Sequence, residues 1–472
     1  MRDPALLDLS EAADAIADGR LSSVEATHAC IDRIEAWQPA INAFITLDRE
    51  RALVQAAERD RELARGQRRG PLHGVPLAHK DLVLRAGRVT TAGSKIMRST
   101  VADRTSTLLE RLDSAGAVDL GTLHMSEFAA GPTGHNVHYG PCRNPYNRDH
   151  ITGGSSSGSG AAVAARLIYG ALGSDTGGSI RLPAANNGIV GLKPTYGRIT
   201  RHGTIARSWS LDHFGPMTRT ARDCALMLQV VAGHDPRDAT SSSSSVPNYL
   251  AALSDTSLTG IRIGIPKETL LREFDPEITA AMEATIRTLE SIGASTKTVP
   301  LPNLKVLLLV AETIIKSEAA TMHRPWLATR PQDYASQVRL RLEAGFLIPA
   351  TQYIDALRLR ALFTREFLDE TMGGIDMLLL PVMPFPVPTI ADTDVEGAGG
   401  EAVAATVGRI TTLTRPFNLL GVPSLSVPAG FCAKGLPIGL QFVGHPSDEA
   451  QLLRIAHAFQ SVTEFHRAVP KL

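Results

Sequence analysis

Short apolar runs that alternate with helix-forming stretches set the narrowest limits on how this chain can fold. From about residue 70 these runs are separated by glycine and proline, and they lie at 76–77, 117–120, 167–172 and 261–265. Strands that alternate with helices predict a largely parallel sheet with helices packed on both of its faces. We therefore expect an α/β fold with a large, twisted, mixed sheet, mostly parallel, that helices cover on both faces.

The charge balance and the cysteines narrow the class of protein. The 472 residues include 48 Lys and Arg against 48 Asp and Glu, whereas a protein that binds a phosphate backbone or an anionic membrane needs an excess of basic residues. The 4 cysteines form no CxxC pair and the 14 histidines no HExxH motif, so we predict neither a disulfide framework nor a metal site. With no recognisable signal peptide or membrane span, the expected compartment is the cytoplasm.

The most unusual segment is the glycine- and serine-rich run 153–160, which leads directly into the alanine-rich stretch 161–165. A helix-forming stretch at its end argues for a tight functional loop rather than a flexible linker. One template for such a loop is the nucleophile elbow G-x-S-x-G, which would place Ser156 at its centre. That match carries little weight, because a segment so rich in glycine and serine produces the pattern by chance.

A second template joins this loop to the segments GVPLAHKD (74–81) and DTGGSIRLP (175–183). A serine hydroxyl is a poor nucleophile until a base takes its proton, and a lysine can be that base if burial keeps it neutral. Lys80 follows an apolar run, so its burial is expected.

The glycines of the segment 175–183 could provide the hydrogen-bond donors that a serine nucleophile needs beside it. Gly177 and Gly178 allow consecutive backbone N–H groups to point toward one oxyanion just before Ser179. Ser179 would attack a carbonyl held there, and Ser155 in the glycine-rich loop would relay protons between Ser179 and Lys80.

These segments closely resemble the motifs of the amidase signature family. The resemblance rests on GVPLAHKD, GGSSSGSGAAVAA and DTGGSIRLP and on the spacing of Lys80, Ser155 and Ser179. It continues through GLKPTYG, DHFGPMTR, PFN and GLPIGLQFVG, and so covers nearly the whole chain. One departure is Ser157, which stands where the family loop commonly has a glycine.

The resemblance implies a role for each of these residues. Ser179 is the nucleophile that forms the acyl-enzyme, Ser155 is the bridging serine that follows a cis peptide bond, and Lys80 is the general base and later the acid. The oxyanion would be held by the backbone of Thr176, Gly177, Gly178 and Ser179.

Three further residues are candidates near the site. Met125, in HMSEFAAG, lies in a segment that runs beside the substrate in the family, although core packing explains it equally well. Asp175 and Arg181 flank the nucleophile, and we predict that they form a buried ion pair that shapes the glycine turn.

We expect a single domain over residues 1–472. It would have N-terminal helices at about 1–65, a catalytic core at about 66–235 and 400–472, and a variable helical region on the substrate side at about 300–375. The N-terminal helices are signalled by the S-x-x-E capping box of Ser22 and Glu25.

The chain is therefore predicted to be an amidohydrolase that cleaves the C–N bond of a small aryl, aliphatic, carbamate-like or urea-like amide through an acyl-serine, without a cofactor or metal. The expected partner is the small-molecule amide, with no nucleic acid and no membrane, and homodimerisation is left open. The alternative is the amidase-like component of a tRNA-dependent amidotransferase complex. We rank it lower, because the charge is balanced and no docking sequence is recognisable. A non-catalytic scaffold on the same fold is a further alternative.

Overall fold

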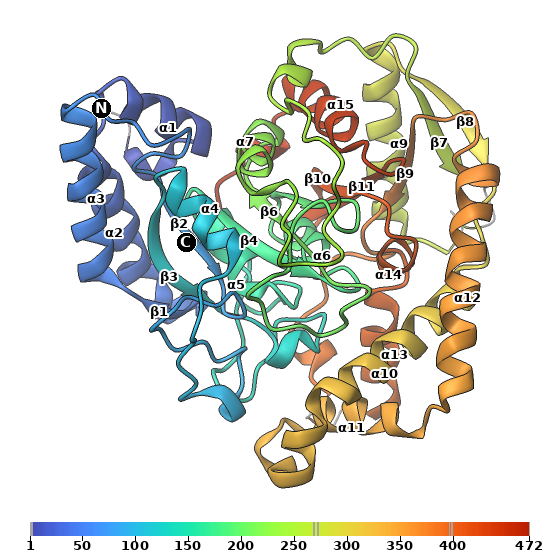
Figure 1. Ribbon diagram of the computed structural model, residues 1–472. Coiled ribbons are helices and arrows are strands. Elements are labelled where there is room, and N and C mark those ends of the chain that lie inside the picture. Colours follow the sequence, from blue (N-terminus) through green and yellow to red (C-terminus); the bar gives the residue numbers. More distant parts are fainter. Residues whose placement is uncertain (1–2, 268–269, 271–272, 396, 398–399, 472) are drawn as a thin grey trace.

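Eleven strands form one sheet through the computed structural model (Figure 1), which describes residues 1–472 except 1–2, 268–269, 271–272, 396, 398–399 and 472. Their order across the sheet is β1-β3-β2-β4-β6-β5-β10-β11-β9-β7-β8. The strands are β1 (Phe44–Leu47), β2 (Pro76–Lys80), β3 (Val118–Leu123), β4 (Gly170–Asp175), β5 (Val190–Lys193), β6 (His213–Thr218), β7 (Arg262–Pro266), β8 (Ser295–Val299), β9 (Met377–Pro381), β10 (Ser424–Phe431) and β11 (Pro437–Val443).

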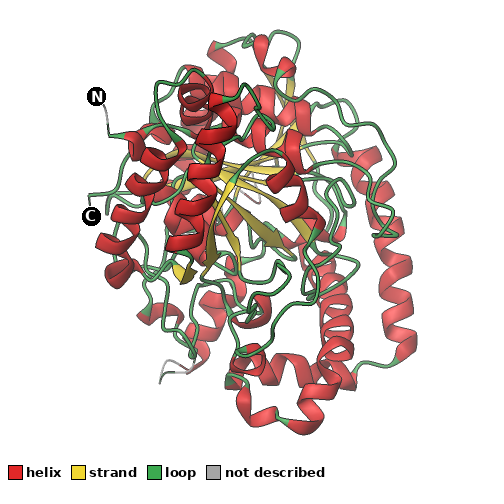
Figure 2. Ribbon diagram, turned by 60° about the vertical axis from the view of Figure 1, so that its left-hand side comes forward, coloured by secondary structure: helices red, strands yellow, loops and turns green. Residues whose placement is uncertain are grey.

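Helices surround this sheet (Figure 2), and the predicted α/β class is confirmed. They are α1 (Leu9–Ala17), α2 (Ser23–Ile41), α3 (Arg49–Ala64), α4 (Thr107–Ser114), α5 (Ser157–Ala164), α6 (Arg181–Asn186), α7 (Ala221–Val231), α9 (Pro276–Ser291), α10 (Leu304–Thr329), α11 (Ser336–Glu343), α12 (Ala350–Glu366), α13 (Gly400–Ile410), α14 (Arg415–Leu419) and α15 (Glu449–Ser461). Figure 1 shows α1–α3 at one end of the molecule and α10–α12 at the other.

The direction of the strands corrects one part of the prediction. Parallel pairs are confined to β2 with β3 and β4 and to β7 with β8 and β9. The other six pairings among the described strands are antiparallel, so the sheet is mixed but not mostly parallel. The sequence did not reveal this, because a strand buried on both faces reads as the same apolar run in either direction.

The local signals in the sequence fall on the expected elements. The four apolar runs overlap β2, β3, β4 and β7. The capping box is formed, with the Ser22 side chain accepting from the N–H of Glu25 at the start of α2. The serine run 241–245 has no helix or strand and is largely solvent-exposed.

A small apolar cluster ties the α10–α11 region to the sheet. Phe128, which follows β3, stacks on Trp326 of α10 with ring centroids 5.5 Å apart and packs edge-on against His323. Tyr334 and Val338 complete the same cluster from the α11 side. The helical region is thereby fixed beside the loops that follow β2 and β3.

Candidate active site

Lys80 is the last residue of β2, a strand that is buried along its whole length between β3 and β4. Its side chain is fully enclosed, with 0% relative exposure. The nitrogen Nζ lies 2.7 Å from Oγ of Ser155 and 2.8 Å from Oγ of Ser174, to which it donates. The fold therefore places a lysine amine against two hydroxyl groups inside the protein.

The environment of Lys80 favours its neutral form. Burial lowers the pKa of the amine to about 7, because an ammonium group loses its hydration inside the protein. The positive charge of Arg207 acts in the same direction, whereas the carboxylates of Asp175 and Asp212 oppose it. A neutral amine that can accept a proton is therefore present near neutral pH.

Ser155 lies in a turn that has no room for side chains. Gly153 has φ +74°, and a Cβ on Gly154 would lie 2.6 Å from the carbonyl oxygen of Gly131. The peptide bond between Gly154 and Ser155 is cis, as the resemblance implies. The carbonyl of Ser155 accepts from the N–H of Ser126 at 3.1 Å, which holds the residue in place next to Lys80.

The neighbouring serines of the loop are engaged elsewhere. Ser156 is fully buried, and its Oγ lies 3.2 Å from both the backbone nitrogen and the carbonyl oxygen of Ser174. The nucleophile-elbow template therefore has no accessible hydroxyl at its centre. Ser157, which replaces the usual glycine, is accommodated by a 2.9 Å hydrogen bond between its Oγ and Nδ1 of His124.

Ser179 and Gly177 are the half-exposed residues of an otherwise buried loop between β4 and α6. The carbonyl of Ser179 accepts from the N–H of Ser156 at 3.3 Å, which brings this loop against the glycine-rich one. Within the described part of the chain, the Ser179 hydroxyl has no hydrogen-bond partner. Of Lys80, Ser155 and Ser179, the last is therefore the one that a substrate can reach.

The predicted oxyanion residues divide into two kinds. Gly178 has φ +126° and donates its N–H to Oδ1 of Asp175 at 2.6 Å, so this N–H is already engaged, contrary to its predicted role. The hydroxyl of Thr176 donates to Oδ1 of Asp212 at 2.6 Å, a bond that does not involve the backbone group for which the oxyanion role was predicted. The N–H groups of Gly177 and Ser179 have no acceptor among the described residues and remain available for an oxyanion.

Asp175 and Arg181 form an ion pair behind the loop, at 3.0 Å and with both side chains 0% exposed. Burial by itself would raise the pKa of the Asp175 carboxyl, yet the guanidinium of Arg181 holds it well below its usual range. Oδ1 of Asp175 also accepts from Nδ2 of Asn418 at 2.8 Å. Because Asp175 binds the N–H groups of Gly178 and Ile180 as well, the pair fixes the backbone around Ser179.

Sequence reasoning missed three residues of this site. Ser174 was passed over although it precedes Asp175 on β4, and its hydroxyl accepts from Lys80. Asn418 lies in the PFN motif, which the resemblance included without giving it a role. Thr414 donates to the carbonyl of Gly177 at 2.7 Å, and no motif pointed to it.

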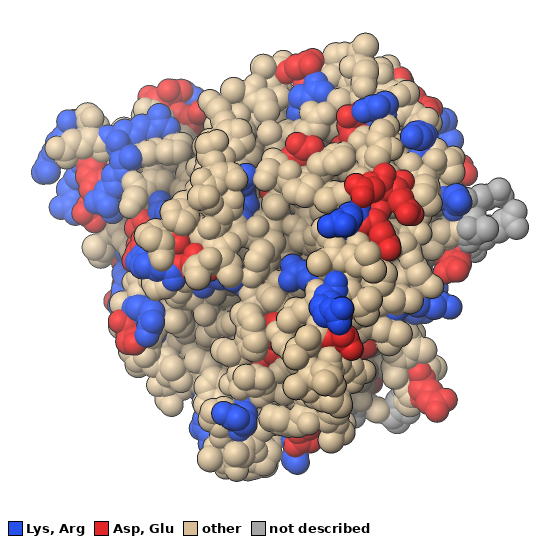
Figure 3. All heavy atoms as spheres, turned by 45° about the vertical axis from the view of Figure 1, so that its right-hand side comes forward, with Lys and Arg blue, Asp and Glu red and all other residues tan. Residues whose placement is uncertain are grey.

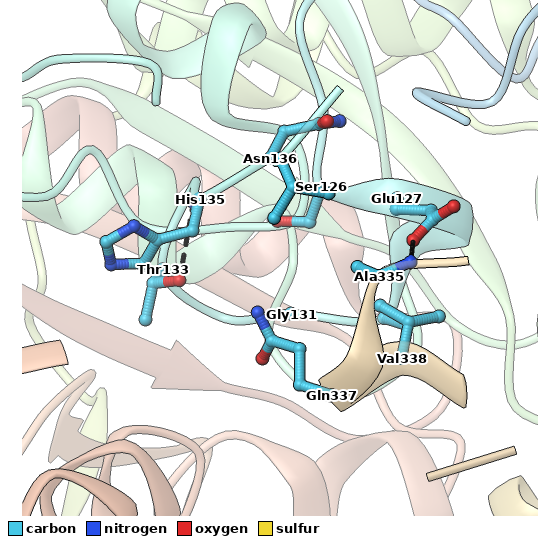
Figure 4. Close-up of a pocket in the computed structure, with 11 residues that line it drawn as sticks. Ser126, Glu127, Gly131, Thr133, His135, Asn136, Ala335, Gln337 and Val338 are labelled. Atoms are coloured by element: carbon cyan, nitrogen blue, oxygen red, sulfur yellow. Dashed lines mark hydrogen bonds between the residues drawn. The ribbon is translucent and has the colours of Figure 1, made fainter. Parts of the chain in front are cut away.

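Met125 lies in the main core and is fully buried. Its carbonyl accepts from Nδ2 of Asn136 at 2.8 Å. The residues that follow Met125 form one wall of a small pocket that opens to solvent (Figure 4). The 11 lining residues are Ser126, Glu127, Ala130, Gly131, Thr133, His135, Asn136, Val137, Ala335, Gln337 and Val338.

This pocket connects the helical region to the loop that carries Ser155. Figure 4 shows Ala335, Gln337 and Val338 facing the segment 126–136, and the carboxylate of Glu127 accepts from the N–H of Ala335 at 2.9 Å. A Cβ on Gly154 would lie 2.9 Å from Oγ of Ser126, so one pocket wall touches the turn before Ser155.

Metal-binding clusters and membrane-spanning helices are both missing from the part of the chain that the structure describes. It contains no group of three or more His, Cys, Asp or Glu side chains arranged to hold a metal ion. None of its helices combines the length and the apolar character needed to cross a membrane.

Comparisons with known proteins agree with this geometry. The Amidase family model matches residues 25–453. In Carboxydothermus hydrogenoformans, the A subunit of glutamyl-tRNA(Gln) amidotransferase is 40% identical over 489 residues, which cover 99% of each chain. A solved structure, described as an unexpected vestigial protein complex that reveals the evolutionary origins of an s-triazine catabolic enzyme, matches with a TM-score of 0.90 at 35% identity over 99% of this chain and 100% of that chain. A solved amidase matches with a TM-score of 0.85 at 35% identity over 96% and 99% of the two chains.

These relatives overturn the prediction about partners. We expected a small-molecule amide and no nucleic acid, with a second copy of the chain left open, but the relative from Carboxydothermus hydrogenoformans is named as one subunit of an amidotransferase for glutamyl-tRNA. Figure 3 shows acidic and basic groups in small clusters of both signs over the face in view, in line with the balanced net charge. The inference failed because the charge of one subunit does not report on a nucleic-acid surface that another subunit of a complex can supply.

Proposed function

This chain belongs to the amidase family, and from that premise we propose that it is the amide-cleaving subunit of an amidotransferase-type complex. One observation carries the proposal: Nζ of a fully buried Lys80 lies 2.7 Å from the hydroxyl of Ser155, beside the loop of the half-exposed Ser179. The 40% identity to one subunit of an amidotransferase supports the complex and reverses our sequence-based ranking, in which the free amidohydrolase came first.

The proposed first half-reaction forms an ester on Ser179. Ser155 accepts the proton of the Ser179 hydroxyl while it passes its own proton to the neutral amine of Lys80. The Ser179 oxygen attacks the amide carbonyl, and the N–H groups of Gly177 and Ser179 stabilise the oxyanion. Lys80 then returns the proton through Ser155 to the nitrogen, the C–N bond breaks, and ammonia leaves.

The second half-reaction releases the acid. A water molecule gives a proton to Ser155 and Lys80 and attacks the ester, and Ser179 regains its proton as the carboxylic acid leaves. In the complex, the ammonia would be used by a partner chain on an activated glutamyl group of tRNA. We further propose a cytoplasmic location and a single domain, in which the helical region at about 300–375 lies on the substrate side.

A free amidase is the second candidate. It is favoured by the solved amidase, which matches with a TM-score of 0.85 at 35% identity and is described without reference to an amidotransferase. Both candidates use the same chemistry at Ser179 and differ in what happens to the ammonia.

The nucleophile is tested by covalent labelling with a fluorophosphonate probe and peptide mapping. We expect the label on Ser179, its loss in Ser179→Ala, a strong decrease in Lys80→Ala, and its retention in the control Ser156→Ala, with folding checked by thermal melting. A label on Ser156 would contradict the mechanism, and labelling of neither serine would favour a non-catalytic scaffold.

The complex is tested with the protein purified from its own cells. We expect partner chains to stay bound in gel filtration and ¹⁵N from a labelled amide donor to appear in the glutamyl group of tRNA(Gln). A chain that elutes alone and releases all of the ¹⁵N as free ammonium would instead establish the free amidase.

A further inference from the structure

A single peptide unit, the one between Gly177 and Gly178, separates the two N–H groups that are available for an oxyanion. Those groups belong to Gly177 and Ser179, and neither has an acceptor among the described residues. The peptide unit between them is held from both of its sides. Its N–H donates to Oδ1 of Asp175 at 2.6 Å, and its carbonyl accepts from the hydroxyl of Thr414 at 2.7 Å. The relative direction of the two oxyanion donors therefore depends on these two hydrogen bonds.

Glycine on both sides leaves this peptide unit little steric restraint of its own. Without a Cβ, Gly177 and Gly178 can adopt conformations that other residues avoid, and the φ of Gly178 is +126°. Hydrogen bonds must therefore supply the rigidity that side chains usually supply. Asp175 provides one of these bonds from within the loop, whereas Thr414 provides the other from a segment 237 positions away.

Thr414 has little freedom to bind elsewhere. Its side chain is fully buried, and the residue immediately precedes α14. The hydroxyl carries one proton, for which the carbonyl of Gly177 at 2.7 Å is a nearer acceptor than the carbonyl of Thr411 at 3.4 Å. A Cβ on Gly178 would overlap Oγ1 of Thr414, so the hydroxyl packs directly against the turn that it holds.

The segment that carries Thr414 contacts the loop at a second point. Asn418, four residues beyond Thr414, donates through Nδ2 to the carbonyl of Asp175 at 2.9 Å and to its Oδ1 at 2.8 Å. The same Oδ1 accepts from the N–H of Gly178. The two groups that hold the peptide unit are therefore connected to each other through residues 414–418, which makes the arrangement rigid.

We propose that Thr414 is a positioning residue for the oxyanion site: its hydroxyl fixes the carbonyl of Gly177 so that the N–H groups of Gly177 and Ser179 point toward one oxyanion. The proposal rests on the proposed function, since the oxyanion forms when Ser179 attacks the amide. Donors that are oriented before the reaction need no reorganisation as negative charge develops on the substrate oxygen. Thr414 acts through the peptide unit and not on the substrate itself.

The test uses the rate of fluorophosphonate labelling at Ser179, on protein purified with any chain that stays bound to it. The phosphoryl oxygen of the probe becomes negatively charged as the serine attacks, so it needs the same donors as an amide oxygen. Labelling over a range of probe concentrations gives a maximal rate constant and a half-saturating concentration.

Thr414→Val keeps the shape of the side chain without its hydroxyl. We expect its maximal rate constant to fall about tenfold to a hundredfold, because the oxyanion donors are no longer held in one direction. The half-saturating concentration should stay within about twofold of the wild-type value, since donors that act on the transition state contribute little to the initial binding.

Two further readouts separate positioning from a general loss of structure. Thr414→Ser retains the hydroxyl and should recover most of the wild-type rate constant, whereas Thr414→Ala should behave as Thr414→Val does. The pH profile of labelling should keep its midpoint near pH 7 in Thr414→Val while its upper plateau falls, because the contacts of Lys80 do not include Thr414.

Thr218→Val is the matched control. Thr218 is also fully buried, and its hydroxyl donates to the carbonyl of Thr220 at 3.0 Å. It pairs with Gly170 at the start of β4, whereas Asp175 and the nucleophile loop lie at the other end of that strand. We expect this variant to be labelled at the wild-type rate, and melting curves compare the stability that the two Thr→Val changes cost.

The outcomes distinguish this proposal from the proposed function. Labelling of Ser179 that is equally fast in the wild type and in Thr414→Val would refute the role of Thr414 alone. The same holds if Thr218→Val slows labelling as much as Thr414→Val does, or if Thr414→Ser recovers nothing. A wild-type protein that is never labelled would refute the acyl-serine of the proposed function, and the oxyanion role of Thr414 with it.

Discussion

The charged groups behind the nucleophile loop are fully buried and paired, whereas those in front of it are half-buried and one of their donors has no partner. Behind the loop, Arg181 binds Asp175, Asn418 and Gln441 at 2.7 to 3.1 Å. In front of it, Arg207 and Arg415 lack a carboxylate within 4.0 Å among the described residues. The difference separates groups that fix the backbone of the catalytic loop through hydrogen bonds from groups that include a buried donor, Nε of Arg415, without a hydrogen-bond partner among the described residues.

Ser179 lies between the two regions, and its removal has the largest expected effect. Ser179→Ala should lower the rate of amide hydrolysis by about 10⁴-fold or more, because the acyl-enzyme can no longer form. Ammonia release from an amide donor is the measurement, and the melting temperature should remain that of the wild type. If Ser179→Ala kept a tenth of the wild-type rate, a residue other than Ser179 would be the nucleophile that the region behind the loop positions.

The next largest effect is expected from Arg181→Met, which disrupts the ion pair behind the loop. This change leaves the carboxylate of Asp175 buried without its cation, which should lower the free energy of unfolding by about 3–5 kcal/mol. Urea denaturation measures the loss. The control is Arg358→Met, where an exposed i,i+3 pair with Asp355 contributes at most about 1 kcal/mol. Equal small effects in both variants would mean that the buried pair does not hold the loop.

The pH dependence tests Lys80, which lies behind Ser155. Since the neutral amine is the base and its pKa is lowered to about 7, the rate of labelling at Ser179 should fall about tenfold for each pH unit below 7 and level off above it. Labelling rates between pH 5.5 and about 9, on protein shown to be folded throughout, provide the measurement. A flat profile would contradict a lysine base.

The same pKa also affects stability. Between about pH 7 and 10 the unfolded chain holds a proton on this lysine that the folded chain lacks, so the contribution of Lys80 to the free energy of unfolding rises with pH in this window. Lys80→Met should lack this increase in urea denaturation curves recorded across the window.

The two regions also differ in how far the sequence predicted them. The α/β class followed from the alternation of apolar runs with helix-forming stretches. The family followed from the motifs around Lys80, Ser155 and Ser179, because a buried lysine and glycine turns need particular residues at particular places. The engaged N–H of Gly178 was not foreseen, since the choice between Asp175 and an oxyanion as its acceptor depends on tertiary geometry.

No comparable sequence motif pointed to the arginines in front of the nucleophile loop. Arg207, Arg341 and Arg415 stand far apart in the sequence and belong to no shared motif, and an isolated arginine is usually a solvated surface residue. Their proximity depends on how the loop before β6, α11 and α14 pack together. Strand directions were missed for a related reason, because pairing joins segments whose apolar runs look alike.

The smallest expected effect tests the comparison most directly, because it concerns the same residue type on the other side of the loop. Arg415→Gln should change the free energy of unfolding by less than about 1 kcal/mol, although the chain carries Arg415 within a few residues of Asn418, a partner of Arg181. Arg415 has no carboxylate within 4.0 Å among the described residues, and its removal gives up an attraction to Glu312 while it relieves repulsion with Arg341. Urea denaturation of Arg415→Gln beside Arg181→Met measures both effects under one condition. A loss near that of Arg181→Met would show that Arg415 is a structural cation like Arg181. The charged groups in front of the loop would then stabilise the fold in the same way as those behind it.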